Sequence, residues 1–275
     1  MNSTELPISP SGISPDPEPI QIQQLYEHVE LYAQGTPPQN TLFVLGQERG
    51  PALASSIQFT LSLDEQGPQE TTELLLIDPP RDAVERFRLE GNVAALYTTP
   101  LATESPSLTF PQVQTQAGGV AHIRIGDHFL DLHSFQAGTI IHLPTLGIVC
   151  SGVLGSDALL PLIADHTDGD DVLNALRFLA SLVKNQHFQL MIPQCGTAVS
   201  DAVDVMGRLA ADVAYIHALQ RVVEATTGQE EDGLATLLSL SDSLLPSTRS
   251  SSLSEERHLL NLQALYLAQE SGLDS

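Results

Sequence analysis

The sequence predicts an α/β protein built of layered sheets and helices, and three observations support this. The first hundred residues contain short β-rich runs separated by turns, with a helical segment among them. Residues 120–150 contain four short runs that alternate between apolar and polar side chains, which predicts strands. Two long helices with apolar stripes then enclose one more buried strand. Strands and helices in this order are typical of an α/β domain.

Composition limits the class of protein before any motif is considered. The chain has 275 residues, 42% of them hydrophobic and 16% charged, which is enough for a large folded core. Its 11 Lys and Arg against 34 Asp and Glu give a net charge of −23, which argues against nucleic acid or an anionic membrane as the main partner. No apolar run has the length of a membrane span, the N-terminus does not read as a signal peptide, and Cys150 and Cys195 make no disulfide framework. We therefore expect a cytoplasmic protein without a membrane span.

The N-terminal segment divides into a tail and a first helix. Residues 1–20 hold five prolines and few apolar side chains, a composition that predicts a disordered tail. Over residues 20–33, Leu25, Val29 and Tyr32 follow the three-to-four spacing of an amphipathic helix. The sequence therefore predicts a short helix there.

The elements that follow can be read from runs of β-branched and apolar residues and from helical stripes. Expected strands before residue 100 lie at 41–45, 57–63, 72–77 and 92–97, with a helix over 82–89. An antiparallel meander is expected from strands at 120–125, 128–132, 139–143 and 147–150. A helix with acidic residues at its N-terminus then begins near residue 170, before a strand at 187–192 and a long helix over 198–224.

The last fifty residues look separate from this arrangement. Residues 233–245 carry a leucine stripe at helical spacing, and residues 252–255 have the form of a capping box at the start of a second amphipathic helix. Each helix must bury its apolar face. Two alternatives are open at this point: docking on the main domain, or binding to a partner or to a second copy.

Several kinds of catalytic site are not supported by the sequence. It contains neither glycine-rich nucleotide motif, and no nucleophile elbow of the G-x-S-x-G type. The nine histidines do not show the spacing of zinc ligands. We read each of them as a surface residue or as a hydrogen-bonded core residue.

Residues 40–225 resemble the metallo-β-lactamase fold in its glyoxalase II-like form. The strand LLLID ends in Asp78, which matches the family's Asp, and Gly138–Thr139 hold the family's G-S position. Gly152 stands where the family has the glycine of G-D, and Pro193 and Gly196 match its last motif. The resemblance implies a four-layer αββα sandwich over residues 21–228, after the tail of residues 1–20, with residues 229–275 as a C-terminal helical extension.

The sequence departs from this family at the metal ligands. The seven matching positions hold Thr99, Leu101, Thr103, Glu104, Phe135, Val153 and Cys195. Zinc needs three or more N, S or carboxylate donors, and two of these residues, Glu104 and Cys195, could serve. The sequence therefore predicts no metal, no cofactor and no catalytic residues at this place, with Asp78 and His133 as the remaining polar candidates.

These observations favour a non-catalytic, metal-free protein-binding, assembly or regulatory factor, that is, a pseudoenzyme. Its acidic surface and the helices of residues 229–275 would bind protein partners, and a homodimer is an alternative. Two readings as a hydrolase stay open. In one, Cys195 is the nucleophile with His133 or Glu104 as base. In the other, ligands outside the family positions hold a metal, such as Asp165, His166 and Asp168.

Overall fold

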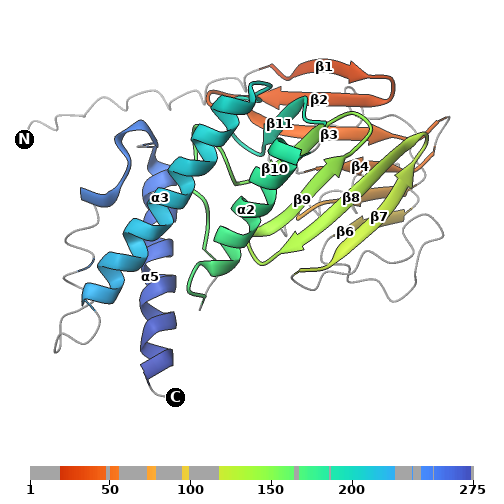
Figure 1. Cartoon of the computed structure of the whole chain (residues 1–275). Helices are drawn as coiled ribbons and strands as arrows, with labels where there is room; N and C mark the ends of the chain where they lie inside the picture. Colours follow the sequence, from red (N-terminus) through yellow and green to blue (C-terminus); the bar gives the residue numbers. More distant parts are fainter. Residues whose placement is uncertain are drawn as a thin grey trace, which may run out of the picture.

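The computed structural model describes residues 19–47, 50–55, 73–78, 95–98, 118–163, 167–185, 187–226, 237, 243–249 and 251–273. Two β-sheets lie face to face, and helices cover the outer face of the second sheet (Figure 1). The fold class is therefore α/β, as predicted from the sequence.

The first sheet is mixed and follows the chain order from one edge to the other. Its strands are β1 (Gln21–Tyr26), β2 (Val29–Gln34), β3 (Gln39–Leu45), β4 (Ala52–Ala54), β5 (Glu73–Leu76) and β6 (Ala95–Thr98). Neighbouring strands from β1 to β4 are antiparallel, whereas β4, β5 and β6 are parallel. As a result, β5 and β6 end at the same edge of the sheet.

The second sheet contains the predicted meander and one further strand. Its strands are β7 (Val120–Ile125), β8 (His128–Phe135), β9 (Gly138–Leu143), β10 (Ile148–Gly152) and β11 (Leu190–Pro193). The first four pair antiparallel in sequence order, and β11 adds to β10 in parallel. Side chains of β7 are alternately exposed and buried, so this strand has one solvated face, as expected.

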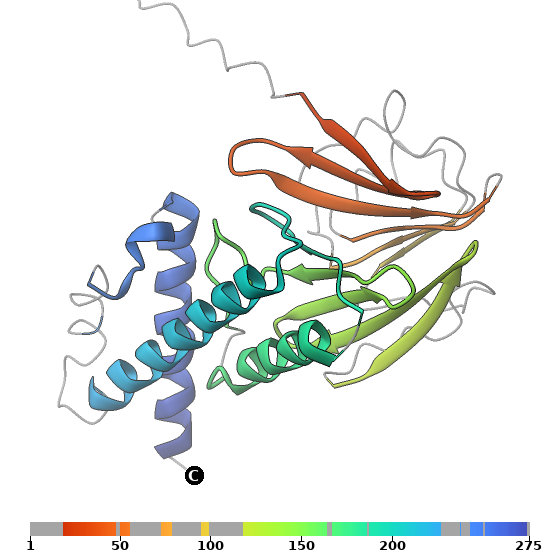
Figure 2. The ribbon, with the colours of Figure 1, turned by 45° about the horizontal axis from the view of Figure 1, so that its top comes forward.

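Three long helices complete the described structure, namely α2 (Asp170–Asn185), α3 (Ala202–Thr226) and α5 (Ser252–Leu273). Helices α2 and α3 lie on the outer face of the second sheet, and α5 crosses behind α3 (Figure 2). The Oδ1 atom of Asp201 accepts hydrogen bonds from the amides of Val203 and Asp204, which caps α3. None of the helices in the described ranges is long and apolar enough to cross a bilayer.

The apolar core has two main parts, one on each side of the second sheet. Between the two sheets, side chains from β2, β3, β4 and β5 pack against those of β7 to β11. On the other side, Ile140, Val149 and Met191 of the second sheet meet the apolar faces of the helices. Because both faces of β9 and β10 are buried, these strands lie at the centre of the molecule.

The predicted helix over residues 20–33 is wrong, because this segment forms the hairpin of β1 and β2. The turn between the strands contains His28, which has a φ of 61°. Val29 and Leu31 are buried between the sheets, and β2 pairs along its length with β3. The two-residue spacing of Val29 and Leu31, which is typical of a strand, therefore describes this segment correctly, and the helical spacing of Leu25, Val29 and Tyr32 does not.

The other predicted elements fall into three groups. Those at 41–45, 72–77, 92–97, 120–150, 170–185, 187–192 and 198–224, and the helix that begins near residue 252, are confirmed as strands or helices, with some changes at their ends. The short strand β4 was not predicted, since a run of three residues without a β-branched side chain gives little strand signal. The strand at 57–63 and the helix at 82–89 lie outside the described residues, as does most of the tail and of the helix at 233–245.

Candidate functional site

Three of the residues that the sequence singled out, Val153, Cys195 and Asp78, lie at one edge of the two sheets. Strand β10 ends at Gly152, which pairs with Pro193 at the end of β11. Val153 and Cys195 follow directly after these strands. Because the carboxyl ends of parallel strands meet at one edge, both residues lie on adjacent loops. Asp78, which follows β5, approaches the same edge from the first sheet.

Asp78 joins the two sheets through its carboxylate. Its Oδ2 accepts a hydrogen bond from the amide of Thr139 at 2.5 Å, and its Oδ1 accepts one from the Thr139 hydroxyl at 3.1 Å. Asp78 has a φ of 43°, an uncommon backbone conformation for a residue with a side chain. Both oxygens of this predicted polar candidate are therefore engaged at the start of β9.

The loop that carries Cys195 is fixed by its neighbours. Asn40 on β3 donates through Nδ2 to the carbonyls of Pro193 at 2.8 Å and Gly196 at 2.7 Å. The hydroxyl of Ser156 donates to the carbonyl of Cys195 at 2.6 Å. The loop after β10 and the loop after β11 are thus bound to each other and to the first sheet.

The thiol of Cys195 is buried, and two charges of opposite sign act on it. The residue is 7% exposed, and burial raises the pKa of its thiol. The guanidinium of Arg257 on α5 lowers the same pKa by a smaller amount, and Asp157 raises it. The neutral thiol is therefore the main form near pH 7.

The side chains of His133 and Phe135, both on β8, pack against helix α2. Both contact Phe178 of α2, with ring centroids 4.3 Å away for His133 and 5.8 Å away for Phe135. Burial lowers the pKa of His133, and the nearby Asp131 partly opposes this. The structure therefore places His133 on the outer face of the second sheet, under α2.

Several other candidates lie outside the described residues. These are Thr99, Leu101, Thr103, Glu104, Asp165 and His166. The strand β6 ends at Thr98, directly before the first of them, and pairs there with Leu76 at the end of β5. Asp168 is described, and its Oδ1 accepts a hydrogen bond from the amide of Asp170, which begins α2. That contact is the helix-capping role that its position predicts.

The described residues at this edge do not fit a metal ion. Val153 is packed against the apolar cluster under the helices, the Cys195 thiol is neutral, and the Asp78 carboxylate is bound to Thr139. Within the described ranges, no group of three or more His, Cys, Asp or Glu could hold a metal ion. We therefore derive no chemical step through a metal from these residues.

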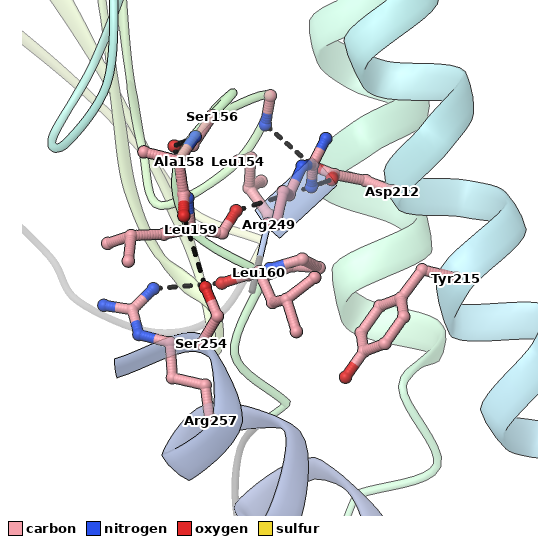
Figure 3. A network of polar contacts seen from close by, with 12 residues as sticks. Leu154, Ser156, Ala158, Leu159, Leu160, Asp212, Tyr215, Arg249, Ser254 and Arg257 are labelled. Carbon is pink, nitrogen blue, oxygen red and sulfur yellow. Dashed lines mark hydrogen bonds and ion pairs between the residues drawn. The ribbon is translucent and has the colours of Figure 1, made fainter. Parts of the chain in front are cut away.

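The C-terminal segment docks on the loop that follows β10, which is the docking alternative of the sequence analysis, although the sequence did not indicate which residues make the contact. A buried ion pair joins Asp212 of α3 to Arg249, and the Asp212 Oδ2 also accepts the amide of Gly155 at 2.7 Å (Figure 3). Asp212 is fully buried. The sequence contains one indication of this ion pair, because Asp212 is an acidic residue on the apolar stripe of a helix, between Leu209 and Ile216.

Side chains of the same segment bind four consecutive carbonyls of the loop. Residues 158–161 form no helix or strand, so their backbone groups need other partners. Figure 3 shows three of the pairs: Ser254 Oγ to Ala158 O at 3.2 Å, Arg249 to Leu159 O at 3.4 Å and Arg257 to Leu160 O at 3.0 Å. The fourth is Asn261 Nδ2 to Pro161 O at 2.8 Å. Asn261 also accepts the amide of Ile163 through Oδ1 at 2.8 Å. Helix α5 is therefore docked on its own chain.

The comparisons with known proteins point to one fold. No family model and no curated protein matches the sequence. Among solved structures, a β-lactamase domain protein from Burkholderia ambifaria is similar over 91% of this chain and 88% of its own, with a TM-score of 0.56 at 13% identity. The sec-alkylsulfatase Pisa1 from Pseudomonas sp. is similar over 90% of this chain, with a TM-score of 0.54 at 12% identity. The chain spans half the length of that alkylsulfatase.

A third structure extends the comparison to a different kind of protein. A fragment of the putative diflavin flavoprotein A 5 from Nostoc sp. matches over 76% of this chain and all of its own, with a TM-score of 0.50 at 9% identity. Identities this low show the fold alone. The chain therefore has the metallo-β-lactamase fold, as the resemblance implied.

The comparisons correct the prediction that the chain is not an enzyme. The two structures with the higher TM-scores are named as a β-lactamase domain protein and an alkylsulfatase, so hydrolytic enzymes use this fold. The prediction inferred an absence of catalysis from the absence of the family's metal ligands. That step does not follow physically, because side chains at a sheet edge can support chemistry without those ligands. Four of the seven ligand positions also lie outside the described residues.

Proposed function

We propose that the protein is a protein-binding, assembly or regulatory factor and that the outer face of α5 is its binding surface. One observation carries the proposal: three leucines seven residues apart stand exposed on this helix. Leu253, Leu260 and Leu267 are 43%, 43% and 44% exposed. We call them the leucine row.

The leucine row is set apart from the face of α5 that docks on the chain. That inner face is buried and consists of Ser254, His258, Asn261, Leu262, Ala264 and Leu265. Residues at seven-residue spacing lie along one line of a helix, so the three leucines form a continuous apolar strip. Apolar strips with a polar border are typical of helix-binding surfaces.

Deleting α5 would not test this proposal. The helix supplies the partners of buried loop carbonyls, and without it these groups would lack hydrogen bonds. Point substitutions on the outer face avoid the problem. Leu260→Glu places a charge at the centre of the leucine row and touches none of the docking contacts.

The experiment is a comparative affinity capture from native cells with the full chain. The matched control is Val203→Glu, because Val203 is 81% exposed on α3 and takes the same substitution away from α5. We expect proteins that the wild type and the Val203 variant both capture to be lost with Leu260→Glu, while both variants unfold at the wild-type temperature. An identical set of captured proteins for all three chains would contradict the proposal.

A second candidate function is a metal-independent hydrolase that uses Cys195. Two observations favour it: the fold is shared with hydrolases, and the charge of Arg257 lies near the thiol. A thiolate could attack an ester or amide carbonyl and release the leaving group, after which water would hydrolyse the thioester. A panel of ester and amide substrates tests this candidate. Turnover that disappears in Cys195→Ala supports it, and equal turnover in both chains contradicts it.

A further inference from the structure

We infer that the partner bound by the outer face of α5 is a basic amphipathic helix, an inference that rests on the proposed function. The argument starts from a second line of residues beside the leucine row. Glu256, Gln263 and Glu270 are all exposed and also lie seven residues apart, three positions after each leucine. We call them the acidic row.

Apolar side chains border the acidic row on both sides. The leucine row lies on one side, and Leu259 and Tyr266 lie on the other. Glu270 accepts a hydrogen bond from the Tyr266 hydroxyl. Lysine and arginine suit such a surface, because their aliphatic stems can cover leucine while their charges reach a carboxylate.

The charge of α5 is not balanced from within the helix. It carries three glutamates and, apart from a buried histidine, one basic residue, Arg257. The guanidinium of Arg257 is directed inward to the carbonyl of Leu160, as Figure 3 shows. The chain as a whole has a net charge of −23. A basic partner would therefore gain from attraction both at the contact and at longer range.

The same charges argue against a second copy of this chain as the occupant. Two copies paired through the leucine row would bring Glu256 and Glu270 of each close to the same residues of the other. Like charges placed across an interface oppose association. A basic helix meets the surface without that repulsion.

The test uses three labelled synthetic peptides and fluorescence anisotropy with the full-length protein. The first peptide is a helix with leucines at three- and four-residue spacing and lysines elsewhere. The second has glutamate in place of each lysine, and the third has the composition of the first in an order that breaks the apolar face. We expect the first peptide to bind at least about tenfold more tightly than the other two.

Substitutions in the protein locate the contact. We expect Leu260→Glu, and separately Glu256→Gln with Glu270→Gln, to weaken binding of the first peptide by at least about tenfold. The affinity should also fall as salt is raised, since exposed charges are screened. Val203→Glu should leave the affinity unchanged. Equal binding by the scrambled peptide, or binding that Leu260→Glu leaves intact, would overturn the inference.

The outcomes separate this inference from the proposed function. If Leu260→Glu abolishes protein capture while no basic peptide binds, the partner class is wrong and the binding surface stands. If neither capture nor peptide binding depends on Leu260, both fail. A dimer in sedimentation experiments that Leu260→Glu converts to a monomer would identify a second copy as the occupant and overturn the basic helix.

Discussion

Asp212 and Arg249 form an ion pair within the protein, and the carboxylate of Asp212 is fully shielded from water. Burial raises the pKa of Asp212, while the guanidinium of Arg249 and the amide of Gly155 oppose this shift. The pair connects three parts of the chain: α3, the loop after β10 and the segment before α5. It therefore links the C-terminal segment to the edge that carries Val153 and Cys195.

Breaking this pair should destabilise the whole protein. In Arg249→Met the Asp212 carboxylate would stay buried without its cation, and the Leu159 carbonyl would lose a donor. We expect the free energy of unfolding in urea to fall by about 3–5 kcal/mol. Arg177→Met is the control, because Arg177 is exposed and bonds only locally to Asn174, and we expect a change below about 0.5 kcal/mol. Equal losses in the two variants would show that the pair adds nothing.

The sequence predicted most of the second sheet and its helices because their patterns are local. Strands β7 and β8 alternate between exposed and buried side chains, whereas β9 and β10 are short apolar runs bounded by turns, and α2 carries one apolar stripe with acids at its start. The hairpin of β1 and β2 was missed because its neutral, glutamine-rich run gives weak strand signals. Its structure depends instead on pairing with β3, which is a tertiary contact.

The candidate site was predicted in part, and its departures from prediction also have physical causes. The resemblance to the family implied that Val153 and Cys195 belong to one site, and in the structure they lie on neighbouring loops because they follow two parallel strands. The sequence could not show that His133 lies under α2, because that depends on how the helix crosses the sheet. Nor could it reveal Asn40, Ser156 and Arg257, whose roles arise from contacts between distant parts of the chain.

Asn261 should be as important for stability as a core residue. Its Nδ2 donates hydrogen bonds to the carbonyl of Pro161 and the hydroxyl of Tyr215, and its Oδ1 accepts one from the amide of Ile163. In Asn261→Leu the Pro161 carbonyl and the Ile163 amide lose these bonds, while the Tyr215 hydroxyl keeps its bond to His258, and we expect the free energy of unfolding to fall by about 2–4 kcal/mol. Amide exchange of Ile163 should accelerate in the same variant. Gln263→Leu makes a similar change on the exposed side of α5, and a loss of the same size there would contradict the explanation.

Acid should weaken the fold through two histidines of the second sheet. Burial lowers the pKa of both His133 and His142, although Asp131 opposes the shift in each. The unfolded chain therefore takes up protons more readily than the folded one. The stabilisation is fully present above the unfolded value of about 6.5 and is lost as the pH falls through the lower folded values.

The measurement is the free energy of unfolding between pH 7.5 and pH 5. We expect it to decrease toward acid in the wild type and to decrease less steeply in His133→Gln, where one of the two groups no longer titrates. His217→Gln serves as the control, because His217 is exposed on α3 and its imidazole bonds to the nearby Gln220. A His133 variant with the wild-type slope would show that this histidine does not contribute.

The thiol of Cys195 should react slowly with alkylating reagents. Burial holds its pKa above the usual range, and the thiolate is the reactive form. In a Cys150→Ala background, which removes the other buried thiol, we expect iodoacetamide to label the folded protein near pH 7 at least about tenfold more slowly than a free cysteine. The rate should reach the free value once the protein is unfolded. If the reaction is fast, the pH dependence of the labelling rate shows why. A midpoint of this dependence below about 8 would show that the charge of Arg257 outweighs burial, and it would favour the hydrolase with Cys195 as nucleophile.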